Sequence, residues 1–228
     1  MRTDEPRTIH LSDYTPPDYL VESLSLHFSL EPEATRVRAE LKMAANHDHA
    51  AQARPLKLDS DDLPLESIAI DGKALDAGAY THDASGLTVH RPPERFTLST
   101  ATVIAPAANT ALEGLYMSSG KYCTQCEAEG FRRITFYPDR PDVLTVWTVT
   151  IDADKATAPV LLSNGNLIEE SNLGEGRHRA VWHDPFPKPS YLFALVAGDL
   201  GCLEDSFTTM SGRKVDLKIW SEHGNQEK

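Results

Sequence analysis

Apolar and polar residues alternate with a period of two along much of the chain, most clearly at residues 24–30 and 37–43. In the first stretch leucine and phenylalanine alternate with serine and histidine, and in the second, apolar residues alternate with charged ones. Successive side chains of a β-strand point to opposite faces, so this pattern predicts two strands that are each buried on one side. Glu31, Pro32 and Glu33 lie between the two stretches and predict the connecting turn.

The same pattern continues to the end of the chain and predicts an all-β protein of antiparallel sheets. Asp71-Gly72 suits the left-handed positions of a hairpin turn, and Ser211-Gly212 predicts a second hairpin within residues 203–220. The three prolines of residues 184–189 cannot donate to a sheet, so this segment is expected to interrupt the strands. We find no amphipathic helix longer than about two turns. Further strands are expected at residues 56–58, 65–70, 87–89, 96–104, 143–151, 160–162, 178–182 and 191–197.

Composition narrows the class of protein. The 228 residues include 40% apolar and 25% charged side chains, which is typical of a soluble globular chain. The net charge of -12 argues against a nucleic-acid partner and mildly favours cationic ligands, although acidity that serves only solubility is an alternative. No apolar run is long enough for a membrane span, and the N-terminal residues lack the apolar core of a signal peptide. Because three cysteines cannot form a closed disulfide framework, we expect a cytoplasmic protein without a membrane partner.

Residues 123–142 combine polar groups and rings more densely than any other segment. If Gln125 to Glu129 runs extended, then Gln125, Glu127 and Glu129 project from one face as a row of oxygen acceptors. Such a row suits a cationic group with several N–H donors. The alternative is that Glu127 and Glu129 only solvate the edge of a strand.

The other polar residues of this segment are expected to support that row. Asp139 and Arg140, between Pro138 and Pro141, are interpreted as a scaffold that aims the acceptors. The aromatic residues Phe131, Phe136 and Tyr137 are expected in the core or at an interface.

Cys123 and Cys126 have the spacing of a redox or zinc pair, but the acidic residues that follow them disfavour a reactive thiolate. We therefore expect free, partly buried thiols. No His-Glu-x-x-His motif occurs, and neither His47 with His49 nor His178 with His183 has the carboxylate neighbours of a zinc site.

Several motifs together resemble the bacterial aminopeptidase N branch of the M1 zinc metallopeptidases. Besides residues 123–142, these are Asn-Thr-Ala-Leu-Glu-Gly-Leu-Tyr at 109–116, Leu-Leu-Ser-Asn-Gly-Asn at 161–166 and the proline-rich segment 184–199, in the order the family has them. The resemblance implies a saddle-shaped antiparallel β-sandwich, the N-terminal domain of an M1 aminopeptidase, at residues 1–195. Residues 196–228 would be the truncated beginning of the thermolysin-like catalytic domain, with its first strands.

The resemblance also implies a function. The complete enzyme would be a zinc-dependent aminopeptidase of the alanyl aminopeptidase type, which removes N-terminal amino acids from peptides. Gln125 and Glu127 match the family's residues that contact the free α-amine of the substrate. An α-amine is largely protonated at neutral pH, and an enclosed carboxylate without a cation costs roughly 3–5 kcal/mol, so internal peptide bonds would be rejected.

The catalytic residues and the zinc ligands are expected outside this chain, since it also lacks the family's Gly-Ala-Met-Glu-Asn motif. The chain alone is therefore expected to be inactive, and its partners to be peptides with a free N-terminus and the remaining domains of the enzyme. The alternative is a stand-alone, non-catalytic β-sandwich that serves as a binding or interaction module.

Overall fold

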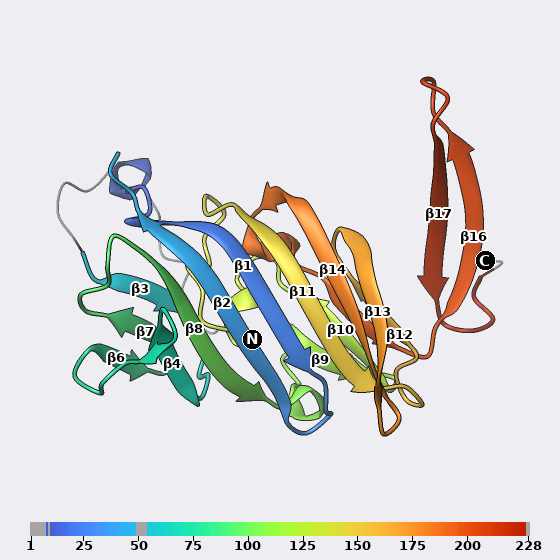
Figure 1. The fold of residues 1–228 in the computed structure, drawn as a ribbon, viewed down its shortest axis with the longest axis horizontal. Coiled ribbons are helices and arrows are strands. Elements are labelled where there is room, and N and C mark those ends of the chain that lie inside the picture. Colours follow the sequence, from blue (N-terminus) through green and yellow to red (C-terminus); the bar gives the residue numbers. More distant parts are fainter. Residues whose placement is uncertain (1–7, 9, 49–53, 227–228) are drawn as a thin grey trace.

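An eight-stranded sheet is the largest element of the computed structural model, which describes residue 8, residues 10–48 and residues 54–226. Its strand order is β13-β14-β11-β1-β2-β8-β4-β5, with β1 and β2 near the centre (Figure 1). The strands are β1 (Tyr19–Ser29), β2 (Thr35–Ala45), β4 (Ser67–Ile70), β5 (Lys73–Ala74), β8 (Arg95–Ile104), β11 (Thr145–Asp154), β13 (Asn166–Gly174) and β14 (Arg177–Lys188).

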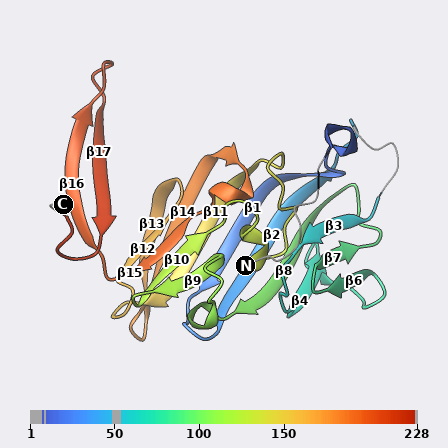
Figure 2. The same ribbon diagram turned by 180° about the vertical axis from the view of Figure 1, so that it is seen from behind.

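Two smaller sheets lie against one face of the large sheet, and Figure 2 shows them from their own side. The four-stranded sheet has the order β12-β15-β10-β9, and the three-stranded sheet has the order β3-β7-β6. Their strands are β3 (Leu56–Asp59), β6 (Tyr80–Asp83), β7 (Gly86–Val89), β9 (Gly114–Ser118), β10 (Lys121–Gln125), β12 (Val160–Ser163) and β15 (Leu195–Gly198). The expected antiparallel β-sandwich is thus confirmed.

The core lies between these layers and is rich in aromatic rings. In β1 and β2 the apolar members of the period-two pattern are buried, as predicted. Trp147 of β11 stacks on Phe193, and Phe193 stacks on Phe28 of β1. Phe131, Phe136 and Tyr137 are fully buried, which confirms that they are core rings.

One pair of strands in the large sheet is parallel. β1 pairs with β11 in parallel, with Leu24 opposite Trp147, whereas β1 and β2 pair antiparallel. A parallel pair needs a crossover connection, and here the whole chain between Ser29 and Thr145 serves as that connection. The centre of the large sheet is therefore built from two segments that are far apart in the sequence.

The prolines of residues 184–189 interrupt the pairing of β14 as predicted, although the strand itself continues through two of them. β14 continues to Lys188, which pairs with Thr145 of β11, but the register shifts between Asp184 and Lys188, so Pro185 and Pro187 have no ladder partner. On the other side, pairing with β13 ends at His183. Beyond that point β14 is an edge strand, and an edge strand tolerates prolines because one side of its backbone has no partner.

The last two strands form a hairpin that projects from one end of the sandwich (Figure 1). β16 (Gly201–Thr208) and β17 (Lys214–Ser221) pair only with each other among the described strands, as the sequence predicted for residues 203–220. The helices in the described ranges are short 3₁₀ turns: η1 (Leu11–Asp13), η2 (Pro106–Ala108), η3 (Phe131–Arg133) and η4 (Ser190–Leu192). None of these helices has the length and apolar content needed to cross a lipid bilayer.

Candidate functional site

The candidate site is a turn at the end of β10. β10 ends at Gln125, which pairs with Gly114 of β9, and residues 127–130 then turn back. The Gly130 N–H donates to the Cys126 carbonyl over 2.9 Å. The predicted extended run from Gln125 to Glu129 is therefore wrong, and the three acceptors do not form a row.

Glycine at position 130 explains why the chain turns here. A Cβ atom on Gly130 would lie 2.3 Å from the carbonyl oxygen of Gln125 and 3.1 Å from the nitrogen of Gly114. Gly114 itself has a φ of 72°, a left-handed value that favours glycine. These two glycines allow the turn to lie directly on the ends of β9 and β10.

The three predicted acceptors divide into two groups. Gln125 and Glu127 are exposed, and the Gln125 amide donates to the Glu127 carbonyl over 3.2 Å. No ion-pair partner contacts the Glu127 carboxylate in the part of the chain that the structure describes. Glu129 instead lies 3.4 Å from the guanidinium of Arg132. The structure thus brings Gln125 and Glu127 together and separates Glu129 from them.

The residue after the turn is fixed in the core. The Phe131 ring contacts Tyr137, Trp147 and Phe193 edge-on, each with ring centroids 5.3 Å apart. Edge-to-face aromatic pairs at this separation are stabilising beyond the area they bury. The C-terminal side of the turn is therefore anchored beneath the exposed residues.

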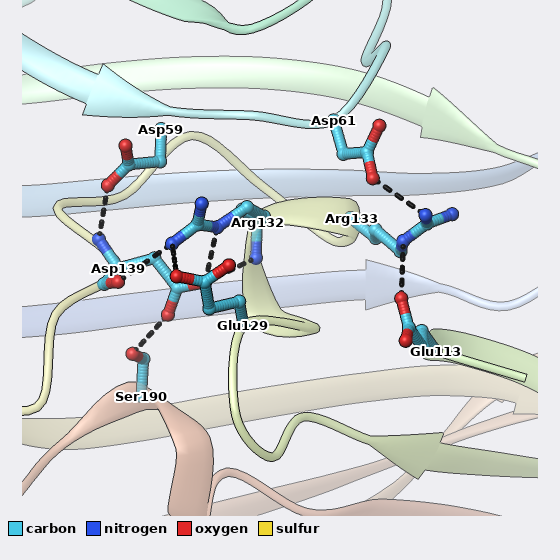
Figure 3. A network of polar contacts seen from close by, with 8 residues as sticks. All are labelled: Asp59, Asp61, Glu113, Glu129, Arg132, Arg133, Asp139 and Ser190. Atoms are coloured by element: carbon cyan, nitrogen blue, oxygen red, sulfur yellow. Dashed lines mark hydrogen bonds and ion pairs between the residues drawn. The ribbon is translucent and has the colours of Figure 1, made fainter. Parts of the chain in front are cut away.

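Arg132 is held by a buried carboxylate (Figure 3). Its Nε donates to Asp139 Oδ2 over 3.0 Å, its backbone N–H donates to the same oxygen over 3.2 Å, and its Nη2 donates to the Asp139 carbonyl over 3.0 Å. The other oxygen of Asp139 accepts a hydrogen bond from Ser190, and the Asp139 N–H donates to Asp59 over 2.9 Å. Burial raises the pKa of Asp59, although the Asp139 N–H and Arg132 oppose the shift.

Arg133 points the other way, toward a shallow hollow. Its guanidinium lies 2.7 Å from Asp61 and 3.2 Å from Glu113. The hollow has a volume of about 340 Å³ and is lined by Asp61, Ala111, Glu113, Ala128, Glu129, Arg132 and Arg133. Both arginines beside the turn are thus already paired with carboxylates.

The predicted Asp139–Arg140 scaffold has different partners. Asp139 binds Arg132, whereas Arg140 pairs with Asp142 over 2.6 Å and stacks over the Tyr14 ring. Burial raises the pKa of Asp142, but the hydrogen bonds from Arg140 outweigh that effect and leave the pKa lowered. Arg140 also donates to the carbonyl of Thr15, so it fastens the N-terminal segment to this loop.

Sequence reasoning missed Asp59, Asp61 and Ser190. Asp59 ends β3 and Ser190 begins η4, so their neighbours in the fold are far away in the sequence. No local pattern signals such contacts. A buried serine beside three prolines gave no indication of a polar role.

The cysteines are free thiols, and Cys126 is buried. Burial, with the nearby Asp139 charge, raises the pKa of Cys126 to about 12. Burial also raises the pKa of Cys123. Neither thiol is activated as a nucleophile.

The described residues hold no group of three or more His, Cys, Asp and Glu side chains placed to bind a metal ion. His178 contacts the Ala158 carbonyl over 2.8 Å, and His183 contacts the Thr148 hydroxyl over 3.1 Å. His49, the second histidine of the 47–49 pair, lies outside the described residues. The described residues therefore do not fit a zinc ion, and no step of zinc chemistry can be assigned to them.

Comparison with known proteins gives one consistent result. The sequence model of the peptidase M1 N-terminal domain matches residues 15–192. Over 224 residues the chain is 53% identical to aminopeptidase N of Caulobacter vibrioides, covering 98% of this chain and 26% of that protein. It is 47% identical to aminopeptidase N of Escherichia coli, covering 99% of this chain and 25% of that protein.

A solved structure agrees with these relatives. The crystal structure of Legionella pneumophila aminopeptidase A in complex with aspartic acid superposes with a TM-score of 0.90 at 35% identity, and the match covers 95% of this chain and 26% of that one. The chain spans about a quarter of the length of the relatives it matches.

Proposed function

The chain belongs to the peptidase M1 N-terminal domain family, and from that premise we propose that it is the N-terminal part of a zinc-dependent aminopeptidase. In this proposal Gln125 and Glu127 anchor the protonated α-amine of a peptide substrate. The zinc ion and the groups that cleave the peptide bond belong to other domains of the enzyme.

The observation that carries the proposal is the unpaired carboxylate of Glu127. Both nearby arginines are committed to other acids, Arg132 to Asp139 and Arg133 to Asp61 and Glu113. In the described part of the chain, Glu127 is left with no internal cation and lies beside the Gln125 amide. A carboxylate and an amide oxygen on a fixed turn can accept charge-assisted hydrogen bonds from an ammonium group.

Such an anchor would explain selection of free N-termini. An α-amine with a pKa near 7.7–8.0 is mostly charged at neutral pH, whereas the nitrogen of an internal peptide bond is not. A carboxylate that is covered by substrate without a cation costs roughly 3–5 kcal/mol. That corresponds to roughly a hundred- to several-thousand-fold preference for the first peptide bond.

The test is the Glu127→Ala substitution in the full-length enzyme. We expect kcat/KM for an amino-acid p-nitroanilide to fall about a hundredfold or more, because the amine loses its charged acceptor. Steady-state kinetics at pH 7 would measure it. Unchanged kcat/KM would remove Glu127 from the substrate site.

Glu170→Ala is the matched control for that test. Glu170 is an exposed carboxylate on the edge strand β13, in a different sheet from the turn. We expect this variant to keep the kinetics of the unmodified enzyme. An equal loss in both variants would mean that overall negative charge, and not the anchor, decides the rate.

We further propose that the first domain runs from residue 1 to residue 198 and that residues 199–228 belong to the next. This boundary lies slightly later than the predicted one at about 195, because β15 (Leu195–Gly198) pairs with β10 and β12 of the sandwich. The family match ends at residue 192, and β15 then completes the four-stranded sheet. The β16–β17 hairpin, which pairs with no other described strand, would be the first part of that next domain and would pack against the rest of it. A cytoplasmic location is part of the proposal and rests on the three free cysteines; cell fractionation would test it.

A further inference from the structure

Asp139 is a fully bonded carboxylate at the meeting point of four chain segments. Its side chain is 1% exposed, and every polar group of the residue has a partner. The partners are Asp59 at the end of β3, Arg132 in η3 and Ser190 at the start of η4, as Figure 3 shows. Burying a charge in this way is favourable only when its hydrogen bonds are complete.

Asp139 contacts Arg132, which lies directly after the 127–130 turn of the candidate site. One oxygen, Oδ2, accepts both the Arg132 backbone N–H and the Arg132 side chain. The backbone bond fixes the main chain of η3 directly, two residues beyond Gly130. On its other side the turn is fixed by β10, through the pairing of Gln125 with Gly114. The residues between these two fixed points include Glu127.

We propose that Asp139 is a positioning residue for the amine site: by fixing Arg132, it holds the 127–130 turn so that the Glu127 carboxylate faces the substrate amine. This inference rests on the proposed function and adds to it the group that aims the anchor. Asp139 itself does not touch the substrate.

The hydrogen bonds of Asp139 allow its charge to be removed while its shape is kept. Its two oxygens face different groups, Oδ1 the Ser190 hydroxyl and Oδ2 the donors of Arg132. An asparagine can place its amide NH₂ toward Ser190, whose hydroxyl also accepts, and its oxygen toward Arg132. Asp139→Asn thus keeps the shape and removes the charge that holds the guanidinium.

The experiment compares two inhibitors of the full-length enzyme that differ only in the α-amine. Alanine hydroxamate carries the amine and propionohydroxamic acid lacks it, while both bear the same metal-binding group. The ratio of their inhibition constants measures amine recognition and does not depend on the fraction of folded enzyme. We expect Asp139→Asn to reduce this ratio about 10- to 100-fold, as a displacement of about 1 Å can do, with propionohydroxamic acid binding unchanged.

Two further variants, Asp142→Asn and Ser190→Ala, serve as comparisons for Asp139→Asn. Asp142→Asn removes a neighbouring carboxylate that pairs with Arg140, and its ratio should equal that of the unmodified enzyme. Ser190→Ala removes one hydrogen bond of Asp139 and should lower the ratio less than Asp139→Asn does. If Asp139→Asn yields no folded enzyme, an unchanged ratio in Ser190→Ala overturns the inference.

Glu127→Ala distinguishes a failure of the proposed amine anchor from a failure of the positioning role of Asp139. If Glu127→Ala leaves the ratio unchanged, the proposed amine anchor itself is wrong. If Glu127→Ala abolishes the preference while Asp139→Asn retains it in full, the anchor stands and the positioning role of Asp139 is overturned.

Discussion

Asp152 ties three strands of the large sheet together through one carboxylate. It lies in β11, is 7% exposed, and accepts hydrogen bonds from Arg179 of β14 over 2.7 and 2.8 Å. On the other side its Oδ2 lies 2.8 Å from Nε2 of His27 in β1. Burial raises the pKa of Asp152, but the bonds from Arg179 and His27 outweigh it and leave the pKa below its ordinary value.

This lowered pKa predicts a pH dependence of stability. The folded protein binds the proton of Asp152 less readily than the unfolded chain does, so the contribution is complete above the unfolded pKa of 3.8. It is lost as the pH falls through the lower folded value. We expect Asp152→Asn to reduce the free energy of unfolding at pH 7 by roughly 1.5–3 kcal/mol and to weaken the loss of stability in acid.

Urea unfolding at pH 7 and at pH 3 measures both effects. Asp76→Asn, a change at an exposed carboxylate, serves as the control and should alter neither value. An acid dependence identical to that of the unmodified protein would show that Asp152 carries no such linkage.

Among the site residues, sequence predicts local neighbours better than distant ones. The extended run that would have aligned Gln125, Glu127 and Glu129 is absent, but Gln125 still contacts Glu127, because its amide donates to the Glu127 backbone carbonyl. Asp139 and Arg140 were expected to form one scaffold, but Asp139 pairs with Arg132 and Arg140 pairs with Asp142. Asp139 and Arg140 lie in a loop, where side-chain partners are set by contacts with distant segments and not by position in the sequence.

At the level of elements, the period-two pattern predicts most strands. It does not predict turns or strand ends that are set by contacts with distant parts of the chain. The strands of residues 24–30 and 37–43 follow from alternation alone, since one face of each is buried. The turn at 127–130 depends on the close approach of Gly130 to Gln125, which a periodicity does not encode. Likewise, Pro185 and Pro187 fit a strand because pairing with β13 ends at His183 and the register with β11 shifts at the prolines.

The close approach at the 127–130 turn predicts that Gly130 cannot be replaced without a loss of stability. A methyl group at this position would meet the Gln125 carbonyl, so Gly130→Ala must shift the turn or β10. We expect a loss of about 1–3 kcal/mol in the free energy of unfolding, the usual cost of overpacking. Urea unfolding measures it.

Gly78→Ala is the matched change, because no atom lies within 4 Å of the added carbon. Its stability should differ little from that of the unmodified protein. Equal stability of the Gly130 and Gly78 variants would contradict the close approach described for the turn.

For the molecule as a whole, the β16–β17 hairpin presents an apolar face without a partner in the described structure. Leu203 pairs with Ile219 and Phe207 with Val215 on this face, and between them Leu217 lies opposite Asp205, the one charged residue of the group. Leu203, Phe207, Leu217 and Ile219 are all more than two-fifths exposed, at 43%, 59%, 43% and 62%. Exposed apolar faces of this kind mark sites of association.

We therefore expect the 228-residue chain to self-associate as its concentration rises. Replacing Leu203 and Ile219 by threonine keeps residues that favour strands and should reduce the association. Sedimentation velocity over a concentration series measures it. Ser206→Ala, on the opposite face, is the control, and association that is the same in all three proteins would place the contact elsewhere.

The parallel pairing of β1 with β11 also decides when the sandwich can be completed. During synthesis β2 and β8 emerge soon after β1 and can pair in sequence, but β1 keeps one unpaired edge until Thr145–Asp154 has left the ribosome. Contacts between distant segments form slowly, and open strand edges attract other chains during that delay. The sandwich can therefore be completed only after β11 is available, and until then the edge of β1 is open to pairing with other chains.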